Sequence, residues 1–419
     1  IMNNTFSIMP KILKKGLFYF SFAVLGLVIA GFMLPYLYKD KIITFIKEKT
    51  NQNLHAEVDF SDANISFFKS FPDVRITIDS LSVMGIDTFD GITLYKSLST
   101  SLDINIPSLL GKEKIPKINS IILDQPEINV VVLDSIHSNY LISKSTEQSS
   151  YQLTLEYYRI DQGKITYQDN QQNLFLILEG VNHEGDGDFT QDIFDLRTKT
   201  SISKLNVKYG GTQYLTDSKA DLQADININF PENKYTLKDN VLKLNELDLT
   251  GEGFVQLNGD DINTDASFKT ESEEFKSLLS IIPNAYTKDF EKVKTSGKAS
   301  FAGTIKGTYN GLKNMFPAFD IKILVENGYV KYPSFQQELS NIFADINIKA
   351  SRPDYKDMSA NIPSFSLKVG SDPITGKLVA NNLTGDQKVE GNLKGKINLK
   401  NLAAAFPIEN LDELTGILL

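Results

Sequence analysis

Carboxylates are plentiful in this 419-residue chain, but cysteine is absent, and the few histidines do not have the spacing of a metal site. The chain has no cysteine and only three histidines, His55, His137 and His183, which share no ligand spacing such as H-x-x-x-H. Without cysteine there are no disulfides, thiolate zinc sites, iron–sulfur ligands or thiol nucleophiles. We therefore expect exposed or hydrogen-bonded loop histidines, no metal site and no cofactor.

The glycine-rich segments also fall short of known motifs. Gly185–Asp188 lacks the D-x-[DN]-x-[DN]-G pattern and the distal Glu of a calcium loop. Gly251–Gly253 is followed by Gln256 where a dinucleotide-binding loop has glycine. Gly111–Lys112 and Gly297–Lys298 lack the rest of a P-loop, and no G-x-S-x-G elbow occurs. Paired carboxylates of a glycosidase stay open as an alternative, but we predict that the protein is not an enzyme.

Charge is unevenly distributed along the chain. There are 43 basic and 52 acidic side chains, a net charge of -9. Residues 1–49 have seven lysines against Asp40 and Glu48, so this part carries +5 and the remaining 370 residues carry -14. The acidic balance argues against nucleic acid as a partner. A basic end on an acidic chain indicates a membrane-proximal end and a solvated body.

The segment Leu17–Tyr38 has 22 residues and no charge. About 20 helical residues span the hydrocarbon core of a bilayer, and tyrosines near both ends suit its interfaces. We predict a basic tail over residues 1–16 and a transmembrane helix over 17–38. A cleaved signal peptide, the alternative, has a shorter apolar region followed by a small-x-small site.

Lysines flank the predicted span on both sides, so the positive-inside rule does not decide its orientation. A long body behind a short tail usually translocates, so we expect the N-terminus in the cytoplasm and the body outside. Residues 39–53 begin with apolar residues among lysines, Ile42, Ile43, Phe45 and Ile46. This pattern predicts an amphipathic helix at the lipid surface.

From about Val58 onward, apolar residues fall at every second position, which predicts antiparallel strands with one apolar and one polar face. Turn signals interrupt the pattern at Gln162–Gly163, Gly210–Gly211, Asn258–Gly259 and Asn327–Gly328. The apolar positions that we expect on one continuous face are Val74, Ile76, Ile78, Leu102, Ile104, Ile106, Ile128, Val130, Val132, Val207, Ile226, Ile228, Ile321, Ile323, Val325, Phe365 and Leu367. Such a face must be covered by a second sheet, by further chain or by acyl chains.

Helical patterns are sparse. Glu273–Ile282 and Asn401–Phe406 each precede a proline, and each is followed by a glycine that opens a strand pattern, at Gly297 and Gly416. This repetition predicts an elongated, repetitive sheet. The second unit is cut short at Leu419, so we expect the sequence to be part of a longer protein.

Five stretches behind the predicted anchor resemble a known family. They are Ala63–Val74 (ANISFFKSFPDV), Ile78–Val83 (IDSLSV), Leu123–Ile128 (LDQPEI), Ile160–Asp169 (IDQGKITYQD) and Gly328–Pro333 (GYVKYP). In this order they resemble the AsmA family of Gram-negative envelope proteins, over most of residues 15–419.

The resemblance implies a single-pass inner-membrane anchor and a periplasmic body, mainly β, whose antiparallel sheet curls into an apolar groove with a few short helices. Residues 54–270 would be the AsmA-like N-terminal groove region, and residues 271–419 further groove repeats. Family members are similar to bridge-like lipid-transfer proteins, and the family is associated with outer-membrane biogenesis and with regulation of protein targeting to membranes. The partners implied are phospholipid acyl chains. No catalytic residues carry over.

Two alternatives stay open beside lipid transport. One is an assembly or regulatory scaffold that contacts other envelope proteins through sheet edges and binds no lipid. The other is an envelope hydrolase, which needs converging carboxylates in a pocket.

Overall fold

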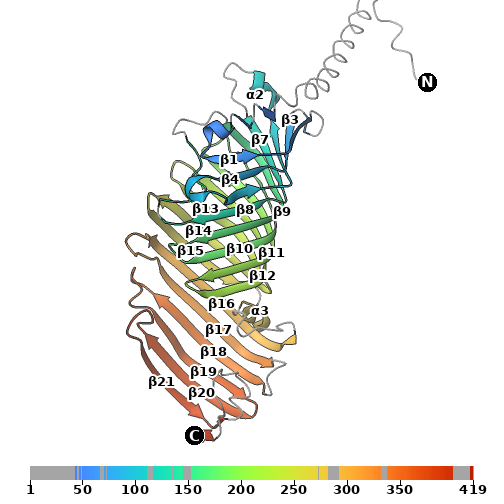
Figure 1. Ribbon diagram of the computed structural model, residues 1–419. Coiled ribbons are helices and arrows are strands. Elements are labelled where there is room, and N and C mark those ends of the chain that lie inside the picture. Colours follow the sequence, from blue (N-terminus) through green and yellow to red (C-terminus); the bar gives the residue numbers. More distant parts are fainter. Residues whose placement is uncertain are drawn as a thin grey trace, which may run out of the picture. The chain divides into compact units, whose positions relative to one another are not determined.

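Strands dominate the computed structural model shown in Figure 1, with 69% of the described residues in strands, so the predicted mainly β class is confirmed. The structure describes residues 43–44, 47–48, 50–66, 70–71, 73–110, 117–134, 136–144, 152–271, 273–281, 292–331, 337–399 and 416–418. The chain divides into unit 1, residues 1–128 and 139–153, and unit 2, residues 129–138 and 154–419. The expected boundary at residue 270 falls within unit 2.

The predicted tail 1–16 and membrane segment 17–38 lie outside the described residues, as does the predicted helix 401–406. In the part of the chain that the structure describes, no helix has the length and apolar character needed to cross a membrane. The described residues of the predicted segment 39–53 are helical, namely 43, 44, 47, 48 and 50–53.

Unit 1 is built of short antiparallel strands. They are β1 (Ala56–Asp59), β2 (Asp62–Ser66), β3 (Val74–Asp79), β4 (Ser82–Gly85), β5 (Thr93–Lys96), β6 (Ser99–Ile104) and β7 (Lys117–Asp124), with η2 (Asp87–Phe89), α2 (Ile106–Leu110) and the start of β8 (Glu127–Val132). β1 pairs with β4 and β2 pairs with β3, and the register is the same in both pairs, from Ala56 opposite Gly85 to Ser66 opposite Arg75. The strands β1 and β2 therefore continue in one direction. β3 also pairs with β6, and β6 with β7.

Unit 2 is an antiparallel ladder in which each strand pairs with the next along the chain (Figure 1). Its strands are β9 (Gln152–Asp169), β10 (Leu174–Asp186), β11 (Ile193–Tyr209), β12 (Thr212–Asn229), β13 (Lys234–Leu244), β14 (Leu247–Asn258), β15 (Asp261–Thr270), β16 (Lys294–Tyr309), β17 (Ala318–Lys331), β18 (Leu339–Ala350), β19 (Ser359–Val369), β20 (Asp372–Asn381) and β21 (Lys388–Gly395). A separate two-stranded sheet joins β22 (Ile397–Asn398) to β23 (Ile417–Leu418). The predicted antiparallel pairing is thus present in both units.

Not every predicted turn is a turn. Gly210 and Gly211 do connect β11 to β12, both with positive φ (55° and 84°), as a tight hairpin requires. Gln162–Gly163 and Asn327–Gly328, also predicted as turns, instead lie inside β9 and β17. There, Gln162 and Asn327 take positive φ (51° and 52°) at shifts of register. The left-handed conformation that both residues adopt makes a β-bulge, which bends the strand without ending it.

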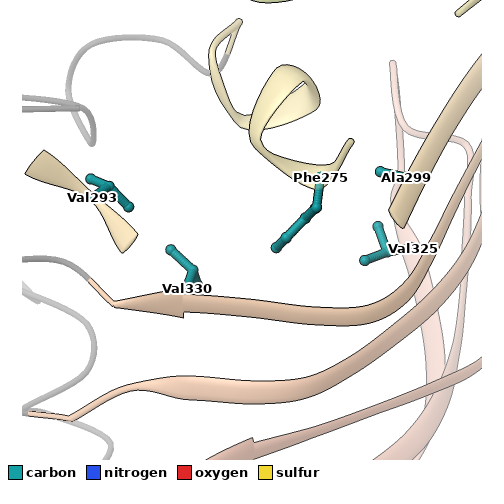
Figure 2. Close-up of a cluster of buried hydrophobic side chains, with 5 residues drawn as sticks. All are labelled: Phe275, Val293, Ala299, Val325 and Val330. Atoms are coloured by element: carbon teal, nitrogen blue, oxygen red, sulfur yellow. The ribbon is translucent and has the colours of Figure 1, made fainter. Parts of the chain in front are cut away.

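A short helix, α3 (Phe275–Leu279), lies where the sequence predicts one, although it is shorter than Glu273–Ile282. Glu274 is extended and bridges Lys298 of β16, so the helix begins only at Phe275. Figure 2 shows Phe275 directed toward Val325 and Val330, which belong to β17. Together with Val293 and Ala299 they form a buried cluster, so α3 covers one part of the sheet face.

Candidate functional site

One face of the unit 2 sheet is apolar across many strands. Residues directly opposite each other in an antiparallel pair share a face, so a row can be followed from strand to strand. From β11 to β17 one row reads Leu196, Ile226, Leu237, Gly253, Ala266, Ile305 and Phe319, all apolar or glycine. The row continues to Ala350 of β18. This apolar face is the candidate functional site.

The opposite face is charged, because the pleat turns each next residue the other way. One position along from that row, Arg197 lies opposite Asp225. Farther on, Lys306 lies opposite Asp265, with 2.7 Å between Nζ and Oδ2. Pairs of opposite charge at exposed positions add little to stability but keep this face in water. The sheet therefore separates an apolar from a solvated side.

The bulges do not interrupt the apolar face. In β10 the apolar residues Leu178 and Val181 are three positions apart, with Gly180 at φ 62° between them. In β11 the same three-residue step separates Ile202 from Leu205, and a register shift lies between them. A bulge adds one residue, so the side chains on either side of it return to the same face.

The predicted face residues of unit 2 are partly accessible except where other side chains cover them. Ile228 (6% exposed) packs in a cluster with Phe194 and Leu196, and Val325 (5%) lies under α3. The half-buried ones are Val207, Ile226, Ile321, Ile323, Phe365 and Leu367. Within the described part of unit 2, α3 is the only α-helix with defined bounds, and it covers only the part of this face around Val325 and Val330.

In unit 1 the predicted residues also meet across strands. Val74 lies opposite Ile104 and Ile76 opposite Leu102, while Ile78 faces Thr100. Val74 and Ile104 are buried, at 5% and 8% exposure. The strand pattern therefore locates these two neighbouring strands correctly.

One predicted face residue of unit 1 is not on a strand, and the most buried residue of β8 lies outside the predicted set. Ile106 is not on a strand but begins α2, because the following Pro107 has no N–H for a ladder and is tolerated in a first helical turn. In β8, Ile128, Val130 and Val132 are half-buried, and the buried residue is Val131 between them (7% exposed). Val131 shares its face of β8 with Glu127 and Asn129, so the period of two places the other apolar side chains of the strand on the predicted face and misses only Val131.

Aromatic rings lie over glycines of the neighbouring strand. A Cβ at Gly376 would come within 2.7 Å of Cζ of Phe365, and one at Gly185 within 2.5 Å of the Tyr158 ring. In both cases ring and glycine are opposite each other in the register. These contacts are not predictable from the sequence, because no local signal shows which aromatic residue faces which glycine.

Around β9–β12, His183 joins a row of aromatic side chains. The ring centroids of His183 and Tyr158 are 5.2 Å apart, and the row continues through Phe189, Phe194 and Phe230. His183 Nδ1 lies 2.8 Å from the Thr200 hydroxyl, and Nε2 lies 3.2 Å from the Tyr158 hydroxyl. Burial lowers the pKa of the His183 imidazole, which favours the neutral ring. The histidine is thus satisfied by structural hydrogen bonds, as expected, but it lies within strand β10 and not in a loop.

A hollow of about 800 Å³ is lined by Glu156, Asp186, Gly187, Asp188, Thr190, Asp195, Arg197, Asp225 and Lys238. Hydrogen bonds from Thr190 and Gln191 lower the pKa of Asp188, and those from Asn227 and Lys238 lower the pKa of Asp195. A glycosidase acid must hold its proton near neutral pH and needs a raised pKa. The pKa values of Asp188 and Asp195 are lowered instead, so neither carboxylate suits the role of the glycosidase acid.

Among the described side chains, no three His, Asp or Glu residues gather as metal ligands would. Comparison with known proteins adds nothing to the chemistry: no family model, curated protein or solved structure matches the chain. The fold defines a mainly β protein built on a long antiparallel ladder. The resemblance to the AsmA family stays a prediction from the sequence.

Proposed function

We propose that unit 2 binds the acyl chains of membrane phospholipids along its apolar face and shields them from water. The observation that carries this proposal is the row of apolar residues and glycines that crosses β11 to β17 with side chains such as Ile226 only half-buried. Soluble proteins rarely leave a large apolar patch uncovered. Because the row crosses from strand to strand, an extended acyl chain could lie along it without leaving apolar surface.

Burial of methylene groups would supply the binding energy, about 0.8 kcal/mol for each group removed from water. Polar headgroups can stay at the edge of the sheet in water, so we expect weak selectivity among them. The charged face, with pairs such as Lys306–Asp265, keeps the other side of the same sheet solvated. No chemical step is needed, which is consistent with a carrier rather than an enzyme.

The remaining parts of the proposal rest on the sequence. The segment 17–38 would anchor the chain in the inner membrane, with the N-terminus in the cytoplasm and the body in the periplasm. Phospholipid would then move along the apolar face between inner and outer membrane and support outer-membrane biogenesis. This assignment follows the resemblance to the AsmA family.

A photo-crosslinking amino acid on β12 tests the proposal. Ile226 belongs to the apolar row, whereas Gln223 of the same strand is exposed on the charged face. In cells we expect lipid adducts from position 226 and none from position 223, as read by mass spectrometry. Adducts to protein alone at position 226 would overturn lipid binding and favour the scaffold alternative.

A further inference from the structure

The most exposed large apolar side chain in the described part of the chain is Phe71, at 80%. It lies in the connection between β2 and β3, in a turn where the Asp73 N–H donates to the Ser70 carbonyl at 2.8 Å. A phenylalanine side chain that stays in water does not contribute the favourable free energy that its burial would give. Such exposure leaves the ring available to an apolar medium outside the chain.

Hydrogen bonds hold this turn in place. The Asp73 carboxylate accepts from the side-chain amide of Asn119 on β7 at 2.9 Å, and from that of Asn105 before α2 at 3.4 Å. These hydrogen bonds attach the turn that contains Phe71 to β7 and to the residue that precedes α2.

A second apolar segment leaves the sheet at the same end. Val74, which opens β3, lies opposite Ile104, which ends β6, and α2 follows directly. Figure 1 shows α2 and β3 together at one end of unit 1. Pro107 of α2 is exposed and Ile106 is half-buried. This end of unit 1, defined by Phe71, Ile106 and Pro107, is called the Phe71 end.

Contacts of the preceding helix show which way the chain enters unit 1. Lys47 Nζ lies 2.5 Å from Asp59 Oδ1 and over the Phe60 ring, while Asn51 exchanges two hydrogen bonds with the Val58 backbone. Traced backward from Asn51 to Lys47, the chain therefore moves from Val58 toward Phe60. β1 and β2 continue in that direction toward the Phe71 end.

Chain length then limits the distance to the predicted membrane segment. Lys47 follows Tyr38 by nine positions, which reach at most about 30 Å when fully extended. From Asp59 to Ser66 the strand advances about 23 Å in the same direction. The Phe71 end therefore lies within reach of the bilayer surface at which residues 17–38 would end.

We propose that the Phe71 end docks onto this bilayer and that the Phe71 ring inserts among its lipids. The inference rests on the membrane anchor of the proposed function. Phenylalanine on a fixed turn suits the boundary between headgroups and acyl chains, where apolar rings are buried at low cost. Docking would hold unit 1 against the membrane from which lipid is taken.

Tryptophan fluorescence gives a direct test, because the chain has no native tryptophan. Full-length Phe71→Trp protein is reconstituted in phosphatidylethanolamine–phosphatidylglycerol liposomes, with and without lipids brominated near the middle of the acyl chain. Leu312→Trp, at a position of unit 2 that is 71% exposed, is the matched control. Leu25→Trp, within the predicted span, reports on the anchor.

We expect brominated lipid to quench the Phe71→Trp variant at least twofold more than the Leu312→Trp variant, and aqueous iodide to show the reverse order. Quenching of Leu25→Trp but not of Phe71→Trp would overturn docking and leave the anchor intact. Absence of quenching in both of these variants would overturn the anchor, and docking with it. Urea unfolding of each variant confirms that the substitution leaves the fold in place.

Discussion

Phe268 of β15 lies over Gly303 of β16, its directly opposite residue: a Cβ at Gly303 would come within 2.5 Å of Cζ of Phe268. The same arrangement recurs at Phe365 and Gly376. A ring over a glycine restores contacts that glycine lacks, a device that also fixes strand register. On the apolar face such a ring fills the space that the glycine leaves on the neighbouring strand.

Gly303→Ala should therefore displace the Phe268 ring. The backbone at Gly303 does not need glycine, since its φ is not in the left-handed region, so the cost is steric. We expect a loss of about 1–3 kcal/mol in the free energy of unfolding, as for other overpacked sites, measured in urea. Gly385→Ala is the control, because nothing lies within 4 Å of its added Cβ. Equal effects at both positions would show that the ring contact is unimportant.

The sequence predicts which residues share a face but not where strands bend. Ile321, Ile323 and Val325 share the apolar face as predicted, because the period of two follows directly from the pleat. Asn327–Gly328 reads as a turn because Asn and Gly favour positive φ, yet hairpins and bulges both use that conformation. Only the pairing with β18 distinguishes them.

Contacts between distant strands are equally hidden in the sequence. Phe268 and Gly303 are 35 positions apart, and their meeting depends on the register of two strands. Phe71 shows a different limit: a phenylalanine in an aromatic-rich stretch is ordinarily assigned to a core, and only the structure shows that it is exposed. The alternating pattern determines which side chains share a face of a strand. Which other parts of the chain cover that face depends on the tertiary structure.

The Arg75–Asp103 pair should be essential to unit 1. Arg75 donates two hydrogen bonds of 2.7 Å to the Asp103 carboxylate, and this interaction raises the pKa of the Arg75 guanidinium. Asp103 is only 7% exposed. Arg75→Met leaves this carboxylate buried without its partner, so we expect a loss of about 3–5 kcal/mol in unfolding free energy.

Arg197→Met is the matched comparison, because Arg197 also pairs with a carboxylate, that of Asp186, but its side chain is 72% exposed. We expect a change within about 1 kcal/mol. Urea unfolding followed by circular dichroism measures both variants. A loss at Arg75→Met as small as that at Arg197→Met would contradict the importance of burial.

His183 should make the fold less stable in mild acid. Burial lowers its folded-state pKa below the usual value of about 6.5, so the unfolded state binds the proton more readily. The contribution of His183 is fully present above pH 6.5 and is lost as the pH falls through the folded-state pKa. Urea midpoints measured at pH 5 and pH 8 should therefore differ more in the wild type than in His183→Gln. An unchanged difference in the variant would assign the acid sensitivity to other groups.

Charge on the apolar face should abolish lipid binding, whereas the same charge on the opposite face should not. Ile226→Glu places a carboxylate in the apolar row between Leu196 and Leu237, where an acyl chain would have to desolvate it. Gln223→Glu places it on the same strand opposite Lys199, among charged neighbours. We expect at least a tenfold loss of fluorescent fatty-acid binding for Ile226→Glu and less than a twofold change for Gln223→Glu. Because Ile226 is half-buried, circular dichroism must first show that both variants fold. Equal loss in two folded variants would mean that lipid does not lie on this face.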